Sequence, residues 1–197
     1  VSSPLTWGFP APSAFLGFVH ALERHLTKSY DVGFSGVGIV CHAFEAQTVR
    51  PNRRQHRVFT QTRNPVFLKR EAGRFIAEGT PAAIVEEGRA HLEVSLVIAV
   101  RAFLEDKAQE DAFADAALAL ALGMRLAGGS ILPAQSARGV SAQWVPLPGA
   151  GAAVRRREAW VRFRYRLLPG FALVHRPDLL ADSLARLREQ DVDATAL

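Results

Sequence analysis

The chain has 197 residues, 49% of them hydrophobic, and its 24 basic and 19 acidic residues give a formal net charge of +5. This length and apolar content suit one globular domain and exclude a disordered chain. A single cysteine, Cys41, excludes an internal disulfide and a four-cysteine zinc site and suits a cytoplasmic protein, and no apolar run reaches the roughly 18 residues of a membrane span.

The first half of the chain predicts a helix, a strand and a basic insertion. Apolar residues recur at helical spacing over residues 13–28, and Ser13 is the predicted N-cap. Residues 34–44 are β-branched and apolar with interspersed glycines, which indicates a strand. Alternation over residues 57–63 favours one arm of a hairpin, and residues 64–83 follow as a long basic loop.

The middle of the chain predicts a strand followed by a helix. Residues 90–104 alternate apolar and polar side chains at the start, which is typical of a strand. Acidic residues then open an alanine- and leucine-rich helix that ends near Met124. Residues 125–132 predict a glycine turn into a short strand.

The last third begins with a connector, residues 133–153, that is rich in Pro, Gly, Ser and Ala. An arginine-rich helix follows and ends at Pro169 and Gly170, before a strand at 171–175 and a last helix at 177–190. The order helix, strand, insertion, strand, helix, strand lacks only a first strand to be a ferredoxin-like α+β unit. We expect that strand upstream of Val1.

Positive charge is concentrated in two blocks. Residues 50–74 carry eight basic side chains against Glu71, and residues 154–176 carry seven arginines against Glu158. Because the guanidinium fork matches phosphate oxygens and stacks on bases, a nucleic-acid backbone is a natural partner. A solvated arginine face is the alternative interpretation.

Motifs for catalysis, metals or cofactors are missing from the sequence. It has no GxxxxGKS phosphate loop and no GxSxG elbow, and the glycines of residues 148–155 match a dinucleotide motif poorly. The six histidines never meet cysteine or carboxylate at a recognised ligand spacing. The sequence thus offers no convincing catalytic constellation, and we predict no cofactor and no metal.

Binding residues are easier to find. Arg125 precedes Gly128 and Gly129, whose amides could approach a phosphate, unless they form only an ordinary turn. Trp7 lies in a proline-rich opening and could stack on an unpaired base, unless it belongs to the core.

Several long segments together resemble one known family: SSPLTWGFPAPSAFLGFVHALER (2–24), GVGIVCHAFEAQ (36–47), TRNPV (62–66), AAIVEEGRAHLEVSL (82–96), MRLAGGSILP (124–133) and YRLLPGFALV (165–174). On these segments the chain is similar to the Csy-type second subunit of the type I-F CRISPR surveillance complex. That family is a Cas-five-like branch of the repeat-associated mysterious protein (RAMP) superfamily.

The resemblance implies one RAMP-type domain over 1–197, with a ferredoxin-like, RRM-like core, a basic β-hairpin arm inserted at 48–83 and a connector at 134–153. It implies that an N-terminal strand and a C-terminal region of the family lie outside this chain. It also implies a non-catalytic role: binding the 5′ handle of the CRISPR RNA (crRNA), pairing with the large subunit and abutting the adjacent backbone subunit. Target DNA would be contacted only indirectly, and phage anti-CRISPR proteins are further potential binders.

The RNA-binding residues that we predict are basic, hydroxyl, amide, aromatic or glycine residues in or beside the matched segments or the insertion: Ser2, Ser3, Thr6, Trp7, Arg53, Arg54, Arg57, Arg63, Asn64, Arg89, Arg125, Gly128 and Gly129.

Two other functions remain open from the sequence. A metal-independent RNA endonuclease would use His20, His42 or His91 as its base, with an arginine stabilising the phosphorane. A protein-only assembly module would use Arg156 and Arg162 to dock an acidic partner and would not contact RNA.

Overall fold

A four-stranded antiparallel sheet forms the centre of the computed structural model, which describes residues 2–3, 8–51, 56–60, 73, 76–79, 88–132 and 139–190. The strand order is β1-β5-β2-β8, with bounds Ser2–Ser3 for β1, Gly88–Ala102 for β5, Val32–Ala46 for β2 and Phe171–Ala172 for β8. The long β2 and β5 confirm the two predicted central strands, and their pairing runs from Val32–Ala102 to Ala46–Ala90.

Two short hairpins and four helices complete the described elements. The hairpins are β3 (Thr48–Val49) with β4 (Val58–Phe59) and β6 (Arg125–Leu126) with β7 (Gly129–Ser130). The helices are α1 (Pro12–Leu26), α3 (Lys107–Leu122), α4 (Ala153–Arg166), which follows a 3₁₀ turn at Ala150–Ala152, and α5 (Pro177–Gln190). All four were predicted, although the ends of α1 and α3 differ from the prediction by one or two residues.

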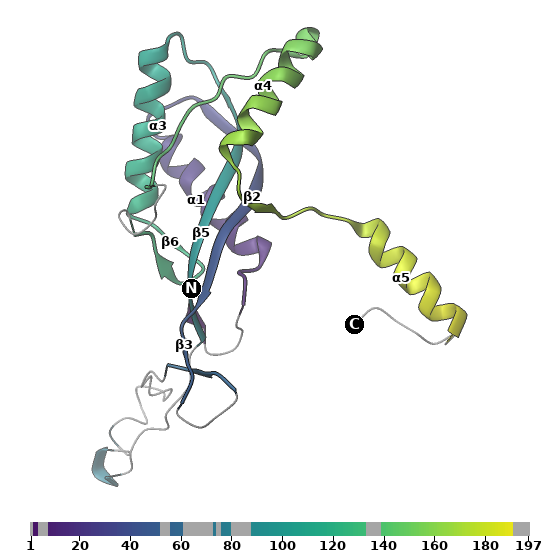
Figure 1. Cartoon of the computed structure of the whole chain (residues 1–197). Coiled ribbons are helices and arrows are strands. Elements are labelled where there is room, and N and C mark those ends of the chain that lie inside the picture. Colours follow the sequence, from purple (N-terminus) through teal and green to yellow (C-terminus); the bar gives the residue numbers. More distant parts are fainter. Residues whose placement is uncertain are drawn as a thin grey trace.

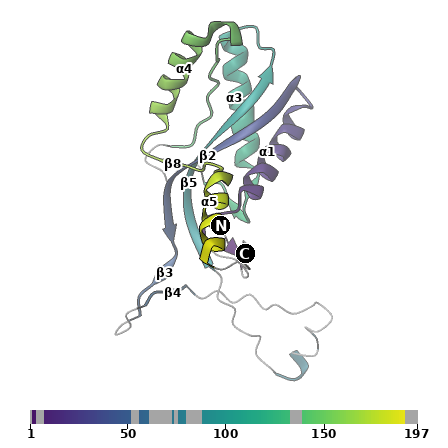
Figure 2. The ribbon, with the colours of Figure 1, turned by 90° about the vertical axis from the view of Figure 1, so that its right-hand side faces the viewer.

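Helices α1 and α3 cover one face of the sheet, as Figures 1 and 2 show. The buried cluster there consists of Leu22 and Leu26 from α1 and Phe113 from α3. Half-buried apolar side chains of the two long strands pack against it, among them Phe34 and Ile98. The amphipathic pattern of residues 13–28 thus predicted most of the buried face of α1, although Leu16 of that pattern is 56% exposed and Phe18 is buried in addition.

The predicted cap of the first helix is wrong. Ala11 is the N-cap of α1 and makes no side-chain cap hydrogen bond, and Pro12 opens the helix. Proline suits that position because its missing N–H would have no partner there. Ser13 therefore lies inside the first turn and does not cap it.

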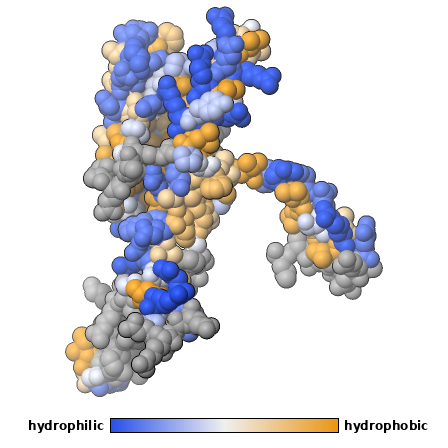
Figure 3. All heavy atoms as spheres, in the orientation of Figure 1, coloured by the Kyte–Doolittle hydropathy of each residue, from blue (hydrophilic) through white to orange (hydrophobic). Residues whose placement is uncertain are grey.

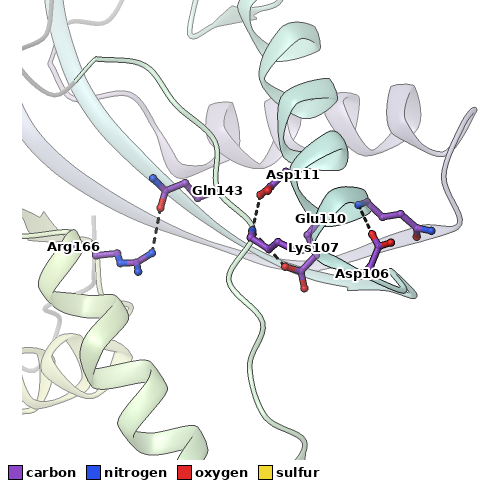
Figure 4. A network of polar contacts seen from close by, with 7 residues as sticks. Asp106, Lys107, Glu110, Asp111, Gln143 and Arg166 are labelled. Carbon is purple, nitrogen blue, oxygen red and sulfur yellow. Dashed lines mark hydrogen bonds and ion pairs between the residues drawn. The ribbon is translucent and has the colours of Figure 1, made fainter.

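The acidic opening of α3 is confirmed in detail. Asp106 is the N-cap, and its carboxylate accepts a hydrogen bond of 2.8 Å from the Gln109 amide (Figure 4). Lys107 forms ion pairs with Glu110 and Asp111 one turn along the helix, and its hydrogen bond to Asp111 raises the lysine pKa.

The fold is mixed α/β with antiparallel sheets, but the ferredoxin-like core is not established by the described residues. In that fold the last strand lies beside the first. Here β8 pairs with β2, at the sheet edge opposite β1. Of the inserted arm, β4 confirms the hairpin at 58–59, whereas residues 61–63 and most of the 64–83 loop lie outside the described residues. Gly73, Ile76 and Ala77 of that predicted loop are helical.

The turn before β8 is fixed to the sheet by His42. Its Nδ1 lies 2.8 Å from the Pro169 carbonyl oxygen and its Nε2 lies 2.8 Å from the Ser95 hydroxyl oxygen. Since a carbonyl can only accept, Nδ1 carries the proton and donates a hydrogen bond to the Pro169 carbonyl oxygen. His42 therefore ties the segment that follows α4 to both long strands.

The turn between β6 and β7 accounts for the glycine at position 128. Ala127 and Gly128 both have positive φ, 48° and 76°, between the paired Leu126 and Gly129. Two positive φ values identify a type I′ turn, which favours Asn-Gly over Ala-Gly. Residues 125–130 thus form a separate hairpin.

Replacing Ala127 with asparagine is expected to stabilise the protein by about 1 kcal/mol, because asparagine tolerates the left-handed region better than alanine does. A chain of this size should then show a Tm higher by about 2–4 °C in thermal unfolding. A lower Tm for Ala127→Asn would contradict the assigned turn.

Candidate nucleic-acid interface

The structure describes seven of the thirteen predicted RNA-binding residues. Thr6, Trp7, Arg53, Arg54, Arg63 and Asn64 lie outside the described residues. The described ones are Ser2 and Ser3 on β1, Arg57 beside β4, Arg89 on β5, and Arg125, Gly128 and Gly129 on the β6–β7 hairpin.

The sheet brings β1 and Arg89 together. Ser2 pairs with Arg89 and Ser3 with Gly88 in an antiparallel register. The Arg89 side chain is exposed, whereas its neighbours Gly88 and Ala90 are buried. Residues 85 and 87 positions apart in the sequence thus share one end of the sheet.

The same end of the sheet continues into the β3–β4 hairpin and reaches Arg57. The Gln47 amide donates a hydrogen bond of 2.8 Å to the Arg89 carbonyl, and Thr48 follows directly as the first residue of β3. Arg57 Nε then donates to the Thr48 hydroxyl at 2.7 Å, and Nη2 donates to the Thr48 carbonyl at 3.3 Å. We call this connected set, Ser2, Ser3, Gln47, Thr48, Arg57 and Arg89, the β-edge site.

Arg57 keeps most of its hydrogen-bonding capacity within the β-edge site. The two contacts with Thr48 use two of the five guanidinium N–H groups. They also restrict the side chain, so less conformational entropy is lost when the remaining N–H groups meet an anion. Gln47 and Thr48 were not predicted, although their place directly before the basic insertion was a usable signal.

The β6–β7 hairpin holds the other predicted residues in a different role. Arg125 Nη2 donates a hydrogen bond of 2.6 Å to the Gly128 carbonyl, across the turn. The glycine is needed for the positive φ of the turn. The described geometry therefore favours the ordinary turn that was the alternative for these glycines, and it does not join them to the β-edge site.

Other kinds of site find little support in the part of the chain that the structure describes. No group of three or more His, Cys, Asp or Glu side chains is placed to hold a metal there. No helix in that part is long and apolar enough to cross a membrane. Both ring nitrogens of His42 are engaged by Pro169 and Ser95, as expected of a structural histidine.

Comparison with known proteins places this mixed α/β chain, with its basic sheet edge, among the CRISPR-associated proteins. All residues, 1–197, match the family model described as CRISPR-associated protein (Cas_Csy2). The chain is also 48% identical over 197 residues to the CRISPR-associated protein Csy2 of Pseudomonas aeruginosa (strain UCBPP-PA14). The chain belongs to the Cas_Csy2 family, which confirms the predicted resemblance to a type I-F second subunit.

The match to the Pseudomonas protein covers 100% of this chain and 58% of that protein. The chain thus spans somewhat more than half the length of the curated relative that it matches.

Proposed function

We propose that this protein is a non-catalytic subunit of a type I-F CRISPR complex and that the β-edge site binds the 5′ handle of the crRNA. The observation that carries the proposal is the continuous path from β1 through Arg89, Gln47 and Thr48 to Arg57. Family membership supplies the type I-F context. The large subunit and the adjacent backbone subunit are the proposed protein partners, and the cytoplasm is the proposed compartment.

Single-stranded RNA is the form of nucleic acid that suits this site. Arg57 and Arg89 are exposed cations at one end of a sheet, where a flexible backbone can bring phosphates to both. Splayed bases would then be free to meet backbone amides and ring faces nearby.

A ferredoxin-like core remains part of the proposal. The element order β1, α1, β2, β5, α3 and the sheet order β1-β5-β2 agree with the first three strands and two helices of that fold. The pairing of Ser2 with Arg89 would also align a strand preceding β1 with the outer edge of β5.

Of the three histidines named as candidate bases of an endonuclease, the contacts of His42 argue against a catalytic role for that residue. An endonuclease would need a histidine whose nitrogen can take a proton from the attacking hydroxyl. His42 Nδ1 donates to Pro169, and its Nε2 is bonded to Ser95, so neither nitrogen is available to substrate.

The decisive experiment measures the affinity of the full-length protein, paired with its large subunit, for a repeat-handle RNA and for a scrambled RNA of equal length. We expect a preference for the handle and an affinity that falls linearly with the logarithm of salt concentration. Equal, weak binding to both RNAs would refute handle recognition. Cleavage of a repeat RNA without magnesium would refute the non-catalytic role.

Replacing Arg57 with alanine is expected to weaken handle binding by about 5–10-fold and to make the salt dependence shallower by about one phosphate contact. The reason is the loss of a restrained guanidinium at the β-edge site. Arg186→Ala, at an exposed position of α5, removes the same charge elsewhere and should leave both quantities unchanged. Equal effects of the two substitutions would show only a general loss of charge.

A further inference from the structure

Helix α4 makes few contacts with the other elements of the described chain. Ala159, Val161 and Phe163 of the helix are half-buried, as is Leu167 directly after it, and the rings of Trp160 and Phe163, both on α4, lie 5.5 Å apart. Near the end of the helix, Arg166 Nη1 donates a hydrogen bond of 3.2 Å to the Gln143 side chain of the connector (Figure 4). None of its side chains is fully buried, so most of its surface is open.

One side of α4 carries a stripe at helical spacing, in which Val161 is half-buried and the other side chains are exposed. We call it the α4 stripe: Val154, Arg157, Glu158, Val161, Arg162 and Tyr165. The first five line one shallow depression along the helix. Val154 and Tyr165 are 73% and 70% exposed, which is unusual for side chains that gain free energy by burial. Figure 3 shows hydrophilic and hydrophobic side chains mixed at this corner of the molecule.

The charge of α4 is unbalanced. The helix has six arginines and one glutamate, and all six arginines are exposed. The ion pairs within the described residues lie on α1, on α3 and between Arg176 and Asp178, and none includes an α4 arginine. Like charges one turn apart, such as Arg162 and Arg166, repel each other and destabilise a free helix. An acidic surface placed over the α4 stripe would offset the positive charge of Arg157 and Arg162.

The apolar residues of the stripe decide which kind of acidic partner fits. A phosphate backbone could pair with the arginines but offers no apolar surface to Val154 and Val161. An amphipathic helix with aliphatic anchors flanked by Asp and Glu satisfies both requirements at once. The α4 stripe also lies at the opposite end of the molecule from β3 and β4, where Arg57 lies (Figures 1 and 2).

We propose that the α4 stripe docks an acidic amphipathic helix of a protein partner, separately from RNA. The proposal rests on the proposed function, because it assumes that the protein works inside a multisubunit complex. It gives the second arginine block a role distinct from that of the first.

The test uses the full-length protein co-purified with the other subunits of its complex. A photo-crosslinking amino acid at position 161 is expected to crosslink to an acidic helical peptide of a protein subunit, identified by mass spectrometry. Arg157→Glu and Val161→Asp are expected to weaken subunit association by at least about tenfold, which is 1.4 kcal/mol or more. Arg186→Glu, at an exposed position of α5, carries the same charge change as Arg157→Glu outside the stripe and should stay within about twofold of the unmodified protein.

The handle-RNA affinity of the same variants separates the two proposals. Weakened assembly with unchanged RNA affinity supports the α4 stripe as a protein surface. A crosslink to RNA, or a loss of RNA affinity in Arg157→Glu with normal assembly, overturns it in favour of a second RNA surface. Normal assembly together with normal RNA binding overturns it while leaving the β-edge site intact. Circular dichroism of each variant must match the unmodified protein, and a photo-crosslink at position 161 that yields no protein peptide also counts against the proposal.

Discussion

Replacing Phe113 with alanine is expected to lower the free energy of unfolding by about 3–5 kcal/mol. Phe113 is only 4% exposed and joins Leu22 and Leu26 in the buried cluster between α1 and α3. Its ring makes edge contacts with Tyr30 at 5.2 Å and with Trp144 at 5.6 Å. The substitution therefore leaves a cavity and removes two aromatic pairs, each worth about 0.5–1.5 kcal/mol beyond burial.

Urea denaturation of the full-length protein, followed by circular dichroism, measures this loss. Phe103→Ala is the matched control, because that side chain is 84% exposed, and its effect should stay within about 0.5 kcal/mol. A Phe113→Ala variant as stable as Phe103→Ala would show that the cluster between α1 and α3 is not the core of the fold.

The sequence predicted the central strands and the main helices because their patterns are long. The apolar face of α1 and the alternation at the start of β5 repeat over several residues, and β2 is a long run of apolar and β-branched residues. The position of β8 could not be predicted in this way. A strand of only two residues is too short to show an alternating pattern. Contacts around His42 and Gly170, which lie far apart in the sequence, hold β8 on β2.

The candidate site also has one part that the sequence predicted and one part that it did not. Ser2, Ser3 and Arg89 were predicted from segments shared with the family, and the structure brings them together through the β1–β5 pairing. The hydrogen bonds that connect Gln47 and Thr48 to Arg89 and Arg57 depend on two strands of two residues each, which leave no signal in a sequence. The turn predicted at Gly128 is present. The positive φ of Gly128 already accounts for a glycine at this position, so the glycine by itself is weak evidence for phosphate binding.

Replacing Gly170 with alanine is expected to lower the free energy of unfolding by about 2–4 kcal/mol, the sum of overpacking and a lost hydrogen bond. A Cβ at this position would lie 2.7 Å from Val40 Cγ1, 2.8 Å from His42 Nδ1 and 2.9 Å from the Leu167 carbonyl oxygen. Real Cβ contacts are longer than this, so the turn must move away from β2. That movement breaks the hydrogen bond between His42 and Pro169.

Gly170→Ala is expected to weaken the pairing of β8 with β2 before it affects the rest of the fold. The Leu173 amide, which donates a hydrogen bond of 3.0 Å to Ile39, is expected to lose protection from hydrogen exchange before the amides that join β2 to β5 do. Gly151→Ala is the control, since nothing lies within 4 Å of the added Cβ, and it should leave both stability and exchange unchanged. Because the turn at Gly170 also carries α4, the same variant should weaken subunit association if the α4 stripe must be held at a fixed angle to the sheet. Full protection of Leu173 in Gly170→Ala would show that β8 is not anchored through this turn.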